Sequence, residues 1–88
     1  MLMKNKNATH AFPLAMANEG ELVKIVGVTG GKKLAKRLIT MGMIENTELQ
    51  ILQRQQGTGL VVLCGETRLA LGTGIAHKIM VMLVQENF

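Results

Sequence analysis

Five short apolar runs separated by glycine-containing breaks are the feature that most constrains the fold of this chain. The runs are rich in Val, Ile and Leu, which favour strands, and they occupy residues 22–28, 47–55, 60–64, 67–71 and 79–84. Glycines fall in the breaks at 30–31, 56–59, 65–66 and 72–74. Because closing a sheet removes the unpaired edges that short strands expose, this pattern predicts a small all-β barrel.

One helix is expected among these strands. Leu34, Leu38 and Met41 recur at i, i+4 and i+7 within residues 32–41, and Gly42 follows where a C-terminal glycine cap belongs. Single helical turns are expected at 13–17 and at 75–78. The order of parts predicts an SH3-like five-stranded barrel with one short helix inserted after the first strand. An OB-fold is the main alternative, but its helix usually lies between the third and fourth strands.

The length of 88 residues allows one domain. We place that domain at residues 12–88, behind a disordered or loosely attached tail at 1–11. The only aromatic residues are Phe12 and Phe88, near or at the chain ends, so we expect a core of Leu, Ile, Val and Met. The run 60–64 is continuously apolar and is expected to be covered on both faces.

Charge and cysteine content bear on the compartment and on the partners. No apolar run approaches the ~20 residues of a membrane span, and the first residues lack the pattern of a signal peptide. The single cysteine, Cys64, cannot form an internal disulfide, so we expect a reduced, cytoplasmic setting. The net charge of +4 favours partners with negative charge.

An ordered set of short motifs resembles one known family. The set begins with Gly20-Glu21 before the first strand and continues with Gly30-Gly31 and with Arg-Leu-Ile-Thr-Met-Gly-Met at 37–43. It ends with Leu-Ala-Leu-Gly at 69–72, Ala76 and Ile-Met-Val at 79–81. No single piece is specific, but the set at these spacings, over residues 14–84, is similar to the ferrous iron transport protein A family.

The resemblance implies a fold and a role. It implies an SH3-like barrel in the bacterial cytoplasm that associates with the cytoplasmic GTPase part of the membrane ferrous iron transporter and regulates that transporter. It also implies likeness to the SH3-like domain of iron-dependent repressors, although this chain has no DNA-binding helices. Where the family usually has Pro-Gly before the strand after the helix, this chain has Glu45-Asn46. Asn tolerates positive φ better than most residues, so we expect the turn to survive.

The sharpest candidate site is a basic arc on the helix, formed by Lys32, Lys33, Lys36 and Arg37. A solvated helix face is the simpler interpretation. Two of these cations lie in the first helical turn, where the helix dipole disfavours positive charge. Residues that oppose a local structural preference, as these cations oppose the helix dipole, are commoner at functional sites. We therefore keep the hypothesis that this arc docks the transporter.

A second candidate follows the helix at Met41, Met43 and Ile44. These residues either form a helix cap with core methionines or provide an adaptable apolar contact surface, which methionine suits. Both interpretations stay open from the sequence.

Neither a metal site nor an enzyme is indicated. His10, Cys64 and His77 are the only soft ligands besides methionine, and no pair has the spacing of a metal motif, so we expect no dedicated iron site and no cofactor. Gly30-Gly31 lacks the spacing of a phosphate-binding loop. The six glutamates are scattered, and none stands in a catalytic arrangement with a nucleophile, so no catalytic residue is assigned.

Three functions compete. A protein-binding regulator of a membrane iron transporter, peripheral to the membrane through that partner, is favoured by the resemblance. A nucleic-acid-binding SH3-like module is the alternative, but the absence of Tyr and Trp argues against base stacking, so we do not expect nucleic acid as the partner. A metal or small-molecule sensor is the weakest of the three. Weak homo-oligomerisation through edge strands stays open.

Overall fold

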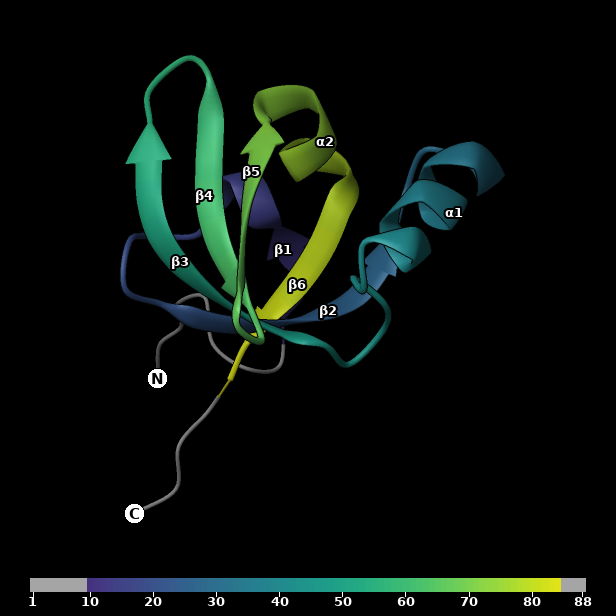
Figure 1. Ribbon diagram of the computed structural model, residues 1–88, viewed down its shortest axis with the longest axis horizontal. Helices are drawn as coiled ribbons and strands as arrows, with labels where there is room; N and C mark the ends of the chain where they lie inside the picture. The colour runs from purple at the N-terminus through teal and green to yellow at the C-terminus, as the bar shows by residue number, and fades with distance from the viewer. Residues whose placement is uncertain (1–9, 85–88) are drawn as a thin grey trace.

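The computed structural model describes residues 10–84, which contain one six-stranded antiparallel sheet (Figure 1). The strands are β1 (Phe12–Pro13), β2 (Leu22–Val28), β3 (Glu48–Gln55), β4 (Gly59–Cys64), β5 (Thr67–Gly72) and β6 (Ile79–Leu83). The helical segments are η1 (Leu14–Met16), α1 (Lys32–Thr40) and α2 (Thr73–Lys78). The strands lie in the order β1-β6-β2-β3-β4-β5. The predicted SH3-like class and the placement of α1 after the first long strand are confirmed.

The strands bury alternate residues, as the two-residue period of a half-buried strand requires. Val23 and Ile25 of β2 are buried, and so are Leu49 and Ile51 of β3, which pairs with it. Pairing of Val23 with Leu49 brings the two inward-facing rows together on the concave side of the sheet. The core therefore fills the interior of a strongly curved sheet.

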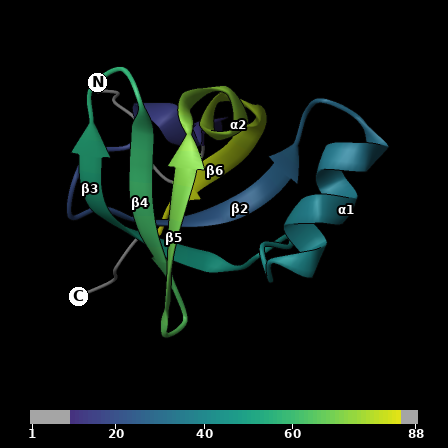
Figure 2. The same ribbon diagram turned by 45° about the horizontal axis from the view of Figure 1, so that its top comes forward.

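The sheet curves into a barrel shape without closing (Figure 2). Within residues 10–84, β1 pairs only with β6 and β5 pairs only with β4, so no strand ladder joins these two outer strands. Instead, η1 and α2 pack against each other, and α2 also contacts β4 and β5. β1 has two residues, one of them Pro13, which has no N–H to donate. The barrel is therefore open, with six strands where the sequence predicted five.

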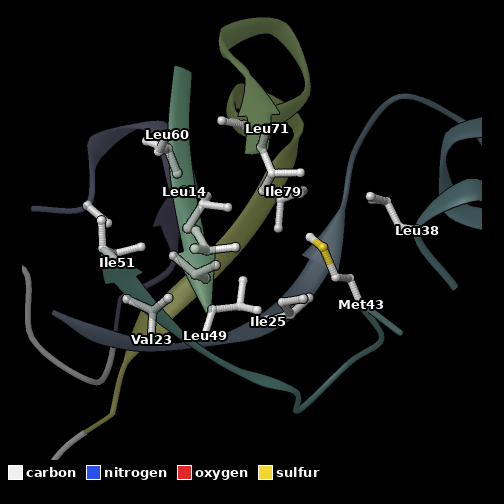
Figure 3. Close-up of a cluster of buried hydrophobic side chains, with 14 of the residues drawn as sticks. Leu14, Val23, Ile25, Leu38, Met43, Leu49, Ile51, Leu60, Leu71 and Ile79 are labelled. Carbon is white, nitrogen blue, oxygen red and sulfur yellow. The ribbon is translucent and has the colours of Figure 1, made fainter. Parts of the chain in front are cut away.

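The core is mainly aliphatic (Figure 3). The largest fully buried side chains are Leu14, Ile25, Leu38, Met43, Leu49, Ile51, Ile79, Val23, Val62 and Val81. Phe12 is only 7% exposed and belongs to this core, because β1 places it opposite Val81 of β6. The expectation of a core without aromatic residues was therefore wrong at this position.

Two local predictions need correction. Leu60 and Val62 of β4 are buried, but Val61 and Leu63 are only partly buried, so the strand is not fully covered on both faces. Length and apolarity alone do not reveal how many faces of a strand are covered. The sheet is interrupted after Gly72 as predicted, but the helical turn expected at 75–78 is longer, since α2 begins at Thr73 and includes Gly74. The tail predicted at 1–11 lies outside the described residues except for His10 and Ala11, which are exposed.

Candidate protein-docking surface

Helix α1 projects from one side of the curved sheet, between β2 and β3 (Figures 1 and 2). The chain enters α1 through Gly30 and Gly31, whose φ angles are 108° and 94°, and leaves it through Gly42 at φ 83°. These left-handed conformations are accessible to glycine without the steric cost of a Cβ. Glycines at both ends thus let the chain leave the sheet, form α1 and return to it.

A Schellman motif fixes the C-terminal end of α1. The Gly42 N–H donates to the Ile39 carbonyl at 2.9 Å, and the Met43 N–H donates to the Leu38 carbonyl at 2.8 Å. Figure 3 shows Met43 between Leu38 of α1 and Ile25 of β2. The bond from Gly42 confirms the predicted glycine cap. Leu38 and Met43, which share the second bond, also pack the helix end on the core.

The basic arc, Lys32, Lys33, Lys36 and Arg37, is exposed along its whole length. Residues 22–44 contain these four cations and Lys24, and no acidic residue. The first turn of α1 has no acidic side chain, and Gly31 provides no side-chain cap for the free N–H groups. The positive end of the helix dipole and the cations therefore add to one another. The side of the molecule that carries α1 is suited to meet negative charge.

A groove runs between α1 and β2, with a volume of about 260 Å³. We call it the α1 groove; it is lined by Ile25, Gly27, Val28, Ala35, Ile39, Met43, Ile44 and Glu45. Ile25 and Met43 are buried and form its floor, whereas Ile39 and Ile44 are 59% and 50% exposed at its rim. Apart from Glu45 the lining is apolar, so the groove can accept an apolar side chain.

The residues of the second predicted site, Met41, Met43 and Ile44, differ in their exposure to solvent. Met41 is 38% exposed and Ile44 lies on the groove rim, so both present apolar surface. Met43 is 1% exposed, and its side chain is a core element that reaches the surface only as groove floor. Of the two interpretations, the core methionine therefore holds for Met43, while its part in binding a partner stays a prediction. Ile39 was missed, although its position four residues after Ala35 was the signal that both would face the same side.

The loop after α1 holds the groove rim in place. Asn46 has φ 75°, the only positive φ of a non-glycine residue within 10–84. Its N–H donates to the Ile25 carbonyl at 2.7 Å, and the Thr47 carbonyl accepts from the Ile25 N–H at 2.9 Å. The Thr47 hydroxyl accepts a further bond from the Ile44 N–H at 3.3 Å. Asn46 therefore adopts the positive φ needed for the turn at which the family usually has Pro-Gly.

A second hollow, of about 440 Å³, lies where the barrel is open, between η1, the β3–β4 turn and α2. Its lining is more polar and includes Arg54, Thr73 and His77. The Arg54 guanidinium donates from Nη1 to the Ala17 carbonyl at 2.7 Å, and the Arg54 N–H donates to a Glu19 carboxylate oxygen at 2.8 Å. These bonds tie Arg54 to the loop after η1, which is a structural role.

The soft metal ligands do not converge in the described part of the chain. No group of three or more His, Cys, Asp or Glu side chains that could hold a metal ion occurs within residues 10–84. His77 is exposed in the last turn of α2, and His10 is exposed before β1. Cys64 is partly buried, with its Sγ 3.9 Å from the Gly42 carbonyl oxygen.

Comparison with known proteins identifies the family. Residues 12–83 match the model of the FeoA domain. The chain belongs to the FeoA domain family. It is 36% identical over 70 residues to a protein of Methanocaldococcus jannaschii named "Putative Fe(2+) transport protein A", and the match covers 80% of this chain and 84% of that protein. The family is associated with Fe(2+) transport.

Solved structures agree with the FeoA fold. The crystal structure of an iron uptake regulatory protein (FeoA) matches with a TM-score of 0.79 and 25% identity, over 85% of this chain and all of that one. A manganese-dependent transcriptional repressor matches with a TM-score of 0.76 and 18% identity, over 84% of this FeoA-family chain and 42% of the repressor. The second likeness concerns the fold alone.

Within residues 10–84, every helix is too short or too polar to cross a bilayer.

Proposed function

We propose that this FeoA-family chain is a non-enzymatic accessory protein that binds the cytoplasmic GTPase domain of a membrane ferrous iron transporter and regulates it. It acts in the cytoplasm and is peripheral to the membrane through that partner. The family's association with Fe(2+) transport supports the system in which it works. In this role the chain itself needs no metal, cofactor or catalytic residue, since iron passes through the partner.

The observation that carries the proposal is the projecting helix α1. Its exposed surface combines the basic arc with the exposed apolar side chains of Met41 and Ile44. Three of the five large exposed hydrophobic side chains of the described chain, Ile39, Met41 and Ile44, lie at this end of α1. Exposed apolar groups rimmed by charge are typical of protein-binding sites. We therefore place the docking surface at α1 and the loop that follows it.

Binding of the full-length chain to the transporter's cytoplasmic domain tests this function. Calorimetry with the domain in its GTP-analogue and GDP forms should show saturable binding that weakens as the salt concentration rises. The double variant Lys33→Glu/Lys36→Glu should weaken that binding and reduce its salt dependence. Gln56→Glu, on the β3–β4 turn at the other side of the sheet from α1 (Figure 1), provides the control and should bind nearly as the unmodified chain does.

Two results would count against the proposed function. Unmodified chain that fails to bind the domain in either nucleotide state would contradict it. Tight binding to duplex or single-stranded nucleic acid in a gel-shift at physiological salt, with none to the domain, would favour the nucleic-acid-binding alternative.

A further inference from the structure

We infer that the α1 groove receives one or two aliphatic or aromatic side chains from an acidic segment of the protein partner, whose carboxylates meet Lys32 and Lys36. This inference rests on the proposed function and adds the side of α1 that is used and the chemistry of the segment that binds there. It depends on how charge and apolar surface are distributed around α1.

The basic arc has two sides with respect to the groove. Successive residues of an α-helix are about 100° apart, so Lys32 and Lys36 lie within about 60° of Ile39, whereas Lys33 and Arg37 lie at least about 120° from it. Ile39 lines the groove. The pair Lys32 and Lys36 therefore borders the groove, and the pair Lys33 and Arg37 faces away from it.

The size and lining of the groove select a side chain as its occupant. Sites for drug-sized molecules usually measure about 300–1,000 Å³ and contain several placed polar groups. The α1 groove is smaller, about 260 Å³, and Glu45 provides its one charged side chain. It is suited to an apolar anchor, in the way that buried hot-spot residues fill pockets at protein interfaces.

The charges along the groove give it a direction. Lys32 is the first residue of α1, whereas Glu45 follows the helix at the other end. A carboxylate of the bound segment is attracted at the Lys32 end and repelled at the Glu45 end. The acidic residues of the partner should therefore lie on one side of its apolar anchor, toward the start of α1.

The same arrangement favours a protein segment over a lipid surface. A helix that lies in a membrane interface directs its apolar face outward, into the bilayer. In α1 the outward side carries the basic arc, and Ala35 and Ile39 face a concave groove backed by β2. A chain segment can enter this recess, whereas a flat bilayer surface would meet the cations first.

Two charge-reversal variants of the full-length chain separate the sides of α1. The groove-side variant is Lys32→Glu/Lys36→Glu, and the far-side variant is Lys33→Glu/Arg37→Glu. Each changes the net charge equally and alters one residue of the first turn and one a turn later. Because Arg37 lies in the last turn of α1, where the dipole favours a cation, urea unfolding of both variants is measured alongside binding. The probe is the transporter's cytoplasmic domain. We expect the groove-side variant to weaken binding by about tenfold or more and the far-side variant by less than about threefold.

The apolar contact between the groove and the partner is tested by a separate variant and by methyl NMR. Ile39→Lys adds positive charge, so it should strengthen a purely electrostatic contact but weaken binding of an apolar anchor by about tenfold. In methyl NMR of the unmodified chain, Ile39, Ile44 and Met43 signals should shift when the domain is added. The Met16 methyl, exposed on η1 away from the groove, is the internal control.

Four other outcomes of these experiments would contradict the inference, and each can be told from the rest. Equal weakening by both double variants overturns the groove while the proposed function stands. Undiminished binding by both variants overturns any role of α1. No binding by the unmodified chain overturns the proposed function, and the inference falls with it. Binding to phosphatidylglycerol vesicles that both variants abolish, with Ile39→Lys binding them more tightly, assigns the surface to anionic lipid instead.

Discussion

The Met43 N–H donates to the Leu38 carbonyl at 2.8 Å, and both side chains are 1% exposed. This bond closes the end of α1 onto the loop that follows it, and the two buried side chains anchor both segments on the core. Since the rest of α1 projects from the sheet (Figure 2), the position of the basic arc and of the α1 groove depends strongly on this pair.

Truncation of Leu38 should destabilise the chain strongly. Leu38→Ala removes a buried side chain and leaves a cavity, which usually costs about 2–5 kcal/mol. Ile39→Ala, on the adjacent and exposed position, should change stability by less than about 1 kcal/mol. Urea unfolding measures both variants, and similar losses of stability for the two would contradict the structural role of Leu38.

Gly59 should tolerate no side chain. An added Cβ would lie 2.0 Å from the Leu71 carbonyl oxygen, and the residue has φ 144°. Gly59→Ala should therefore break the pairing of β4 with β5 and cost several kcal/mol, since backbone must move to relieve the contact. Gly57→Ala is the matched control, because it has φ 82° but nothing within 4 Å, and it should cost only about 1–2 kcal/mol. Equal losses of thermal stability in the two variants would contradict the close contact between Gly59 and the Leu71 carbonyl.

Asn46 should accept glycine but not alanine. At φ 75° an alanine is strained by about 1–2 kcal/mol, whereas glycine has no such penalty. Asn46→Gly should keep or slightly raise stability, and Asn46→Ala should lower it and loosen the loop that carries Ile44. Chemical denaturation gives the stabilities, and hydrogen exchange at the Asn46 amide, bonded to the Ile25 carbonyl, reports the loop. Equal stability of the two variants would show that the positive φ is not needed.

The first turn of α1 should become more stable when its positive charge is removed. Lys33 lies where the helix dipole disfavours a cation by about 0.3–1 kcal/mol. Lys33→Gln should therefore stabilise the chain slightly at low salt, Lys33→Glu should stabilise it more, and both gains should shrink as salt screens the charges. Unfolding measured at two ionic strengths checks this order. A loss of stability in Lys33→Glu would mean that the lysine has a structural partner.

Most of the strands and α1 could be predicted from the sequence because their signals are local. The buried rows Val23/Ile25 and Leu49/Ile51 follow from a two-residue period, and α1 from the spacing of Leu34 and Leu38. The exposed basic arc was equally visible, because four cations within six residues of a helix have to face solvent.

The α1 groove could not be predicted in this way. Ile25 of β2 and Ile44 of the loop after α1 are far apart in the sequence, and only the fold brings them to the same recess. Met43 and Ile44 are neighbours of similar apolarity, yet one is 1% exposed and the other 50%. Which of them enters the core depends on where the Schellman turn directs the chain relative to β2.

The sequence by itself determined the positions of the five longer strands and of α1, the glycine cap at Gly42, the turn at Asn46 and the charge of α1, because each depends on a few adjacent residues and their allowed φ angles. The tertiary structure alone decided that the barrel stays open beside η1 and α2, that Phe12 enters the core, and that Ile39 borders a groove. These features depend on which distant segments pack against one another, and burial is a property of that packing and not of the residue.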